Sequence, residues 1–291
     1  MAKISILLFL SQFADDSTIT YFSKISIEHA KEVIEKELII VLEWLAANKL
    51  IINLSKTQLM VFSNSPHRDP VSITVNNQII NEITETKFLG VILDNKLCWD
   101  AHIKHISNKM SKSVSILKML KHTFPTNALK TIYHSLIYPY FNYCNLIWGS
   151  AANSHLQSLT LIQKKCIRII SKAEFYAHTE PIFNEYELLT IPKIYNYNCA
   201  KFIYQCYTNK TYANFKDRLL TNWDIHGRNT RNKNALRKPK TRLHKFSNSF
   251  LYNGIDEWNQ LADRIKLAAS FTSFKILAKA SILRATNIVI S

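Results

Sequence analysis

The chain has 291 residues, and its 47% hydrophobic and 20% charged residues are typical of a globular protein rather than a disordered one. Its 4 glycines and 7 prolines argue against a turn-rich all-β fold and favour a helix-rich one. The five cysteines show neither paired spacing nor closely spaced Cys/His sets, which favours a reduced intracellular protein over a disulfide scaffold or a zinc knuckle.

The net charge of +16 is distributed unevenly along the chain. Residues 1–99 carry 9 Lys/Arg and 11 Asp/Glu, whereas residues 100–250 carry 23 and 7. Such asymmetry predicts a module that binds a polyanion next to a unit of a different kind. The length agrees with two units, because domains usually contain about 100–200 residues.

A β-hairpin with two adjacent acids at its tip is predicted near the N-terminus. The apolar residues 4–10 lead to Asp15 and Asp16, and a second β-prone run follows at residues 18–22. Because successive strand side chains point to opposite faces, neighbouring acids can share one ion only at a tight turn, and such an oxygen-rich tip suits Mg²⁺. A secretory signal is the alternative for residues 4–10. The run is short and no small-residue cleavage site follows, so we expect a buried strand.

The rest of the first hundred residues combines one helix with short strands. Hydrophobic periodicity and turn residues predict the following elements. They are a helix at 26–47, strands at 50–54 and 58–62, and a hairpin over 73–83 with Asn76 and Asn77 near its turn.

From about residue 101 the hydrophobic pattern becomes helical. The expected helices are 103–120, 126–138, 154–172, 193–207 and 271–283, the last capped by Ser270 or a neighbour. His102 and His105 lie on the first helix without further metal ligands nearby and are expected to be surface residues. Residues 226–249 contain eight basic residues and no acid, which predicts a linker or loop that orders on nucleic acid. No run approaches the ~18 apolar residues that a transmembrane helix needs.

Three short boxes stand out along the chain. They are Phe13-Ala14-Asp15-Asp16 followed by Ser17, then Asn53 with Lys56 and Thr57, then Phe88-Leu89-Gly90-Val91 with Asp94 and Trp99. In this order they resemble boxes of the reverse transcriptases of non-LTR (LINE-type, jockey-like) retrotransposons. Residues 250–259 are similar to an aromatic-Gly-Trp-Asn segment near the C-terminus of jockey-like elements. The resemblance covers most of residues 12–283.

The resemblance implies an RNA-directed DNA polymerase that transfers nucleotides with two divalent metal ions, Mg²⁺ or Mn²⁺. It implies that Asp15 is a metal ligand, that Asp16 is its less essential neighbour, and that Lys56 lies near the leaving pyrophosphate as a proton donor. A nearby ammonium can offset the charge that a leaving phosphate oxygen gains. On spacing alone, the alternative is that these side chains are solvated turn residues.

The resemblance also implies that Phe88, Leu89 and Gly90 form a hairpin that supports the primer terminus. Gly90 is expected to let another backbone approach closely, and a plain structural hairpin is the alternative. Basic helices suit a thumb that grips phosphates without regard to sequence, although any one basic face can simply be solvated. The implied partners are an RNA template and an RNA–DNA hybrid or a DNA primer. The candidate nucleic-acid-binding residues are Lys104, Lys109, Lys112, Lys164, Lys165, Arg168, Arg228, Arg231, Arg237 and Lys238.

Together these features predict an α+β fold. A partial reverse-transcriptase palm, made of antiparallel hairpins and a helix, is expected to precede an all-α thumb-like helical domain. The expected parts are the palm at 1–100, the basic thumb-like domain at 101–210, a basic linker or loop at 211–249, and an aromatic segment with a helix at 250–291.

One part of the family's catalytic site has no counterpart in this sequence. The family takes an essential carboxylate from an earlier palm strand, and only twelve residues, none of them acidic, precede Phe13. We therefore expect a fragment that does not polymerise DNA alone. Two other hypotheses stay open: a non-catalytic protein that binds nucleic acid through the basic helices, and a protein whose helices bind other proteins. A nuclear or cytoplasmic location without a membrane segment is expected.

Overall fold

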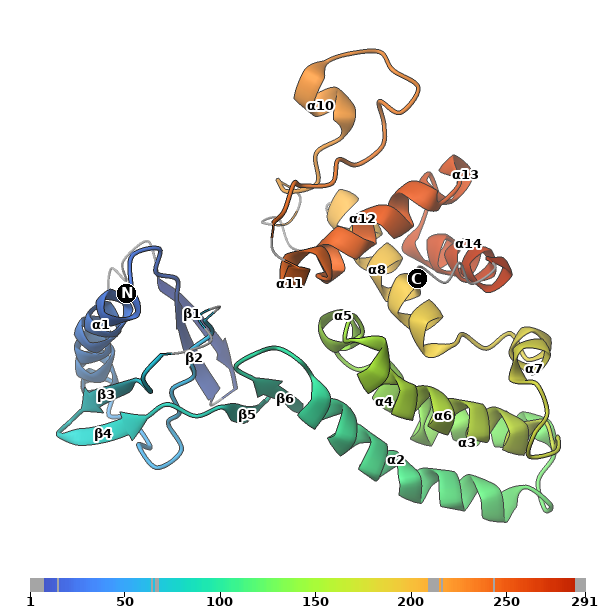
Figure 1. The fold of residues 1–291 in the computed structure, drawn as a ribbon, viewed down its shortest axis with the longest axis horizontal. Helices are drawn as coiled ribbons and strands as arrows, with labels where there is room; N and C mark the ends of the chain where they lie inside the picture. The colour runs from blue at the N-terminus through green and yellow to red at the C-terminus, as the bar shows by residue number, and fades with distance from the viewer. Residues whose placement is uncertain are drawn as a thin grey trace. The chain divides into compact units, whose positions relative to one another are not determined.

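The computed structural model describes residues 8–14, 16–63, 65, 68–208, 215, 217–242 and 244–285. The chain has an α+β fold of small antiparallel hairpins and many helices, as the sequence predicts (Figure 1). It divides into two compact units, Met1–Leu97 and Cys98–Ser291. Within the described ranges, no helix is long and apolar enough to cross a membrane.

The first unit contains three antiparallel hairpins. Across its described residues each hairpin is a separate two-stranded sheet. The pairs are β1 (Leu8–Phe13) with β2 (Asp16–Tyr21), β3 (Ser72–Val75) with β4 (Gln78–Asn81), and β5 (Glu85–Phe88) with β6 (Val91–Asp94).

Two of these hairpins turn through two residues with positive φ. Asn76 and Asn77 have φ of 48° and 61°, and Leu89 and Gly90 have φ of 44° and 83°. Two successive left-handed residues define the turn whose twist matches that of the flanking strands. The hairpins predicted around Asn76-Asn77 and over residues 87–94 are therefore confirmed.

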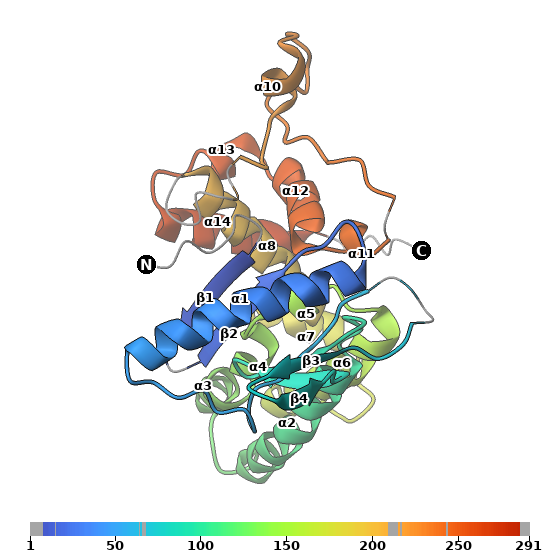
Figure 2. The ribbon, with the colours of Figure 1, turned by 90° about the vertical axis from the view of Figure 1, so that its left-hand side faces the viewer.

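Helix α1 (Ile27–Ala47) confirms the helix predicted at residues 26–47. The Ser26 hydroxyl caps its first turn by accepting a hydrogen bond from the His29 amide at 3.1 Å. The helix packs against β3 (Figure 1, Figure 2), where the amide of Thr74 donates to the Glu35 carboxylate at 3.0 Å. Leu38, Ile73, Val75 and Ile80 form a buried hydrophobic cluster in this unit.

Two predictions for the first unit are wrong. The strands expected at residues 50–54 and 58–62 do not form, because residues 54–56 make a turn and Leu59 makes a single bridge to Glu82. The strand expected to be buried at residues 4–10 is described from Leu8, and its side chains Phe9 and Leu10 are 61% and 43% exposed. Among the described residues, strand β1 pairs with β2 alone, and the Phe9 ring contacts the Phe22 ring with centroids 6.0 Å apart.

The second unit begins with seven helices. They are α2 (Asp100–Leu120), α3 (Thr126–Leu136), α4 (Tyr138–Asn142), α5 (Asn145–Trp148), α6 (Asn153–Ile170), α7 (Thr179–Glu185) and α8 (Ile191–Tyr207). The periodicity located α2, α3, α6 and α8 correctly. The expected apolar stripe of α2 is buried from Ile103 to Leu117.

His102 does not lie on the surface, contrary to the sequence-based prediction. Its side chain is 2% exposed, and its ring lies 5.8 Å from that of Trp148. Burial, with a smaller contribution from His105, lowers the pKa of His102 to about 4. The imidazole is therefore a neutral part of the core at pH 7.

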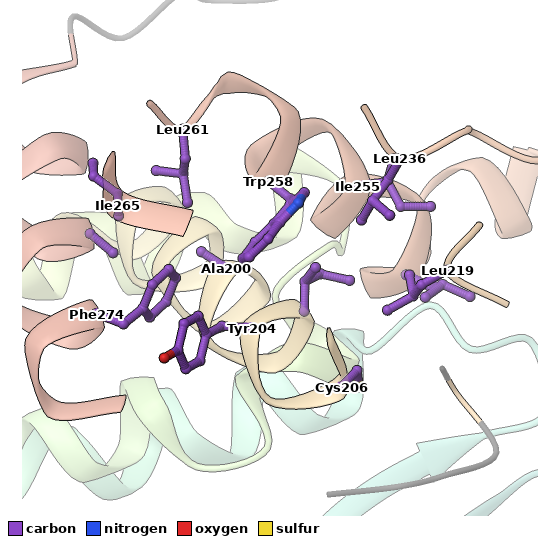
Figure 3. Close-up of a cluster of buried hydrophobic side chains, with 13 residues drawn as sticks. Ala200, Tyr204, Cys206, Leu219, Leu236, Ile255, Trp258, Leu261, Ile265 and Phe274 are labelled. Atoms are coloured by element: carbon purple, nitrogen blue, oxygen red, sulfur yellow. The ribbon is translucent and has the colours of Figure 1, made fainter. Parts of the chain in front are cut away.

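Three C-terminal helices share a core with α8: α12 (Phe250–Gln260), α13 (Asp263–Lys266) and α14 (Phe271–Arg284). The short helices α10 (Asn222–His226) and α11 (His244–Ser247) precede them in the chain. Tyr204 of α8 stacks on Phe274 of α14 with ring centroids 4.1 Å apart, and Trp258 of α12 lies beside both (Figure 3). Helix α14 confirms the prediction for residues 271–283, and the Ser270 hydroxyl caps it by accepting from the Ser273 amide.

Part of the acid-free segment 226–249 is bound to α12. The side chain of Asn259 accepts from the Leu236 amide and donates to the Leu236 carbonyl, both at 2.9 Å. Leu236 is 2% exposed and belongs to the core around α8. The middle of this segment is thus fixed to the second unit, and the basic residues around it are held at the surface of a folded body.

Candidate active site and nucleic-acid interface

The carboxylate box lies at the end of the β1–β2 hairpin. Phe13 pairs with Asp16 in the last rung of the ladder, and Ala14 has a φ of 53°. Asp16 is the first residue of β2 and is exposed. Asp15 lies outside the described residues. The predicted hairpin is thus confirmed, and it presents the Asp16 carboxylate to solvent.

The tip offers the oxygen chemistry that a magnesium ion needs. Mg²⁺ is usually held by one or two carboxylates together with water and substrate phosphates, and the exposed Asp16 carboxylate fits one of these positions. No group of three or more His, Cys, Asp or Glu side chains that could hold a metal occurs within the described ranges.

Asn53 organises the second box as a compact turn. Its carbonyl accepts from the amides of Lys56 and Thr57 at 3.1 and 3.0 Å and from the Thr57 hydroxyl at 2.9 Å. Its side-chain oxygen accepts from the Ser55 hydroxyl at 2.7 Å. The box is thus a self-bonded turn, and Lys56 is exposed on it. This local bonding competes with strand pairing and explains why the expected strands are absent.

The third box is the turn between β5 and β6. Phe88 is half-buried and pairs with Val91, while Leu89 is 37% exposed. The φ of 83° at Gly90 lies in the left-handed region, which glycine adopts at little cost. This is a different reason for glycine from the close backbone approach expected from the sequence. The exposed Leu89 is the unusual residue, because left-handed φ is costly for a residue with a branched apolar side chain.

Helix α2 presents a basic face. Lys104, Lys109 and Lys112 are exposed, outside the buried stripe of this helix. A hollow of about 490 Å³ lies beside Lys109 and Lys112, and its other lining residues are His105, Asn108, Ser113 and Tyr140. Two ammonium groups and a phenol at one hollow can contact both the phosphate and the sugar or base of a nucleotide. The sequence-based prediction missed Tyr140, which comes from the short helix α4 just after Pro139.

The predicted basic residues of α6 differ in their surroundings. Lys165 is exposed and Lys164 is half-buried. Arg168 is half-buried, and its Nε donates to the carbonyl of Ala177 at 2.9 Å. Arg168 therefore bonds the segment after α6 to the end of that helix.

The basic residues of the C-terminal half fall into two groups. Arg228, Arg231 and Arg237 are exposed. Lys238 forms a salt bridge with Asp256, and its ammonium lies 4.0 Å from the centre of the Tyr252 ring. Lys238 therefore holds the segment before α11 to α12.

The comparisons with known proteins give one consistent result. Over 190 residues, or 64% of its length, the chain is 30% identical to the RNA-directed DNA polymerase from mobile element jockey of Drosophila melanogaster. It is 28% identical over 188 residues to the corresponding jockey protein of Drosophila funebris and over 187 residues to the probable RNA-directed DNA polymerase from transposon X-element of Drosophila melanogaster. The chain is similar to RNA-directed DNA polymerases of Drosophila mobile elements. The resemblance expected from the three boxes is thereby confirmed.

The matched region is a small part of each of these relatives. The chain spans 20% of the length of each of these curated relatives. No family model matches the chain, and no solved structure matches it. The roles assigned to Asp15, Asp16, Lys56, the Phe88–Gly90 turn and the basic residues stay predictions.

Proposed function

We propose that this chain is part of an RNA-directed DNA polymerase of a non-LTR retrotransposon, and that its helical unit binds the RNA template and DNA primer. The supporting observation is the similarity to jockey and X-element polymerases. The charge distribution adds a physical reason, because residues 100–250 carry 23 basic and 7 acidic residues. Lysines on a folded surface bind nucleic-acid phosphates without regard to sequence.

In this proposal the two units have different tasks. The unit Met1–Leu97, with its hairpins and α1, corresponds to part of the palm, and the unit Cys98–Ser291 corresponds to the thumb and the region after it. The turn of Phe88, Leu89 and Gly90 supports the end of the primer. Its exposed apolar Leu89 suits contact with a sugar or base more than with a phosphate.

In this proposal, metal binding and proton donation belong to the first unit, at the β1–β2 turn and at the turn that contains Lys56. Asp15 and Asp16 hold Mg²⁺ or Mn²⁺, which when bound offsets negative charge on nucleotide phosphates. Lys56 is exposed on a turn that Asn53 fixes, so its ammonium can reach an anionic leaving group without being buried first. The carboxylate of Asp16 is exposed and therefore accessible to an ion from solvent.

Charge reversal of the α2 face tests the binding proposal. Affinity for a fluorescent RNA–DNA hybrid is measured by anisotropy between 50 and 300 mM salt. Replacing Lys104, Lys109 and Lys112 by Glu is expected to weaken binding at least tenfold, and to flatten the salt dependence because fewer counterions are released. The matched control changes three exposed lysines of the other unit, Lys24, Lys36 and Lys49, to Glu. Equal losses in both variants would contradict a specific role of α2.

A non-catalytic nucleic-acid-binding protein is the second candidate function. The observation that favours it is the basic face of α2, which belongs to a helical unit with its own core and needs no catalytic group. Primer extension on an RNA template with Mg²⁺ or Mn²⁺ separates the two candidates. Hybrid binding without nucleotide incorporation supports the second candidate, whereas incorporation that Asp15→Asn abolishes supports a catalytic chain and contradicts the expectation that these residues do not polymerise alone.

A further inference from the structure

The loop between α6 and α7 exposes two adjacent aromatic side chains. Phe175 and Tyr176 are 71% and 87% exposed, more than any other aromatic residue within the described ranges. Their ring centroids lie 4.9 Å apart, and the ring planes are nearly perpendicular at 89°. Exposed rings in such a pair retain a contact with each other while leaving ring faces open to solvent.

The backbone around the two rings is attached to the end of α6. The amide of Ala173 donates to the Arg168 carbonyl at 3.1 Å, and the amide of Ala177 donates to the Glu174 carbonyl at 3.2 Å. The Arg168 side chain holds the Ala177 carbonyl at 2.9 Å from the other side. Residues 173 and 177 are therefore both fixed to the same helix end, and the two rings project from a short anchored segment.

Lysines lie near this end of the bundle. Helices α2 and α6 lie side by side (Figure 1) and run in the same direction, because Asp100 pairs with His155 and Ser107 contacts Ser158. Their carboxyl ends therefore lie together next to the α6–α7 loop. At and near these ends the chain has Lys118, Lys121, Lys165 and Lys172, and the loop, α7 and the residues after it have Glu174, Glu180, Glu185 and Glu187. Ammonium groups near exposed rings suit an anionic partner that also has flat apolar surfaces.

We propose that Phe175 and Tyr176 stack on unpaired bases of a single-stranded nucleic acid while the neighbouring lysines contact its phosphates. Every nucleobase has an aromatic face, so such stacking tolerates any sequence and adds to the phosphate contacts. The inference rests on the proposed function, since it names the single-stranded part of the nucleic acid as the ligand of this loop. In a paired hybrid the bases are stacked on one another and their faces are not available to the two rings.

The test compares strands that carry bases with an abasic strand. Anisotropy is measured with a 20-nucleotide oligo(dT), an abasic strand of equal length and charge, and oligo(U) as the RNA counterpart. The double variant Phe175→Ala/Tyr176→Ala is expected to bind oligo(dT) and oligo(U) about 10- to 100-fold more weakly, with unchanged affinity for the abasic strand and an unchanged salt dependence. Both rings are exposed, so the variant is expected to keep the wild-type fold, which circular dichroism checks.

Two further variants make the result specific. Phe175→Tyr/Tyr176→Phe keeps both rings and is expected to bind as the wild type does. Leu267→Ala removes an apolar side chain that is 81% exposed elsewhere in the same unit and is expected to change nothing. Unchanged binding of oligo(dT) and oligo(U) by the ring-free variant, or an equal loss on the abasic strand, would overturn the proposal and leave the loop as a site for another kind of partner. If the wild type binds no strand and no hybrid, the proposed function itself fails.

Discussion

The amide of Ile191, the first residue of α8, donates to the side-chain oxygen of Gln163 on α6 at 3.0 Å. The nitrogen of the same side chain donates to the Leu189 carbonyl at 2.9 Å and to the Tyr133 hydroxyl at 3.1 Å. Gln163 is 1% exposed, so one buried amide joins α6, α3 and the start of α8. A fully bonded buried network of this kind fixes how helices pack, because any shift leaves polar groups without partners.

Replacing Gln163 by Leu is expected to destabilise the helical unit by about 2–4 kcal/mol, because the Ile191 amide and the Leu189 carbonyl stay buried and lose their partners. The measurement is urea unfolding of the full chain, followed by fluorescence and circular dichroism. Gln157→Leu is the matched control, since Gln157 is exposed on the same helix and its replacement should change stability by less than about 0.5 kcal/mol. A similar stability for the two variants would show that the network contributes little.

This network shows what the sequence could and could not predict about the helices. Apolar residues at helical spacing, such as Leu156, Leu159 and Cys166, predicted both the helix and its buried side correctly. Gln163 falls on that same side, but hydrophobic periodicity has no means of telling a buried amide from an exposed one. Its partners come from residues 26 to 30 positions away along the chain, so only the folded structure brings them together.

The salt bridge of Arg68 and Glu82 gives the first unit an acid-sensitive contact. Both side chains are largely buried, and the Glu82 carboxylate also accepts from the Val71 amide at 3.1 Å. The hydrogen bond from Arg68 is the main cause that lowers the pKa of Glu82 below its usual range. Because the folded-state pKa is depressed, this contribution to stability is present above the ordinary carboxyl pKa and is lost as the pH falls through the folded-state value.

Glu82→Gln is expected to destabilise the first unit by about 1–3 kcal/mol at pH 7, and the difference from wild type should shrink at acid pH. Hydrogen exchange of peptides within residues 68–94 measures the stability of this unit directly. Glu85→Gln removes an exposed carboxylate from the neighbouring strand and is the matched control. A difference between Glu82→Gln and wild type that does not depend on pH would contradict the assigned role of the carboxylate charge.

The stability of the second unit should depend on pH in the opposite direction because of Glu257 of α12: it should fall as the pH rises, whereas the contribution of Glu82 is lost as the pH falls. Burial, reinforced by the adjacent Asp256, raises the pKa of Glu257 to about 7. The folded state therefore binds this proton more tightly than the unfolded state, and stability falls as the pH rises from the ordinary carboxyl pKa to about 7. The loss is complete above that value, where the buried group carries its charge.

Glu257→Gln is expected to stabilise the chain by about 1–2 kcal/mol at pH 8 and to leave its stability nearly unchanged at pH 4, because the neutral amide resembles the protonated acid. Urea unfolding at the two pH values, monitored through Trp258 in the same helix, measures the effect. Asp263→Asn, at an exposed position in the same unit, is the control. If the variant gains more stability over wild type at pH 4 than at pH 8, the predicted direction of the pH dependence is wrong.

The hairpins show a second limit of sequence-based prediction. Asn76-Asn77 was located correctly, because a two-residue turn is set by the residues at the turn itself, whereas the strand–turn–strand that contains Leu89 and Gly90 was inferred from the family resemblance. The strands expected at 50–54 and 58–62 failed, since Asn53 bonds the chain into a turn and a strand also needs a partner elsewhere in the sequence. The carboxylate box was recognised from its residues, but the exposure of Phe9 in the strand before it depends on which strands lie alongside.

The backbone conformation of Leu89 is expected to destabilise the β5–β6 hairpin, while its exposed side chain is expected to contact nucleic acid. Its φ of 44° is costly for leucine, and Asn tolerates that conformation better. Leu89→Asn should therefore stabilise the β5–β6 hairpin by up to about 1 kcal/mol, and Gly90→Ala should destabilise it by a similar amount. Hydrogen exchange of residues 85–94 measures both changes.

The same two variants also test whether the turn supports a primer. If Leu89 contacts the nucleic acid, Leu89→Asn will bind an RNA–DNA hybrid more weakly although its hairpin is more stable, because the apolar contact is lost. Gly90→Ala keeps the Leu89 side chain but destabilises the hairpin. Its affinity for the hybrid should therefore fall only as far as the folded fraction of the hairpin falls. Hybrid affinity by anisotropy at fixed salt separates these effects. Affinity that rises and falls with hairpin stability in both variants would show that Leu89 makes no contact of its own.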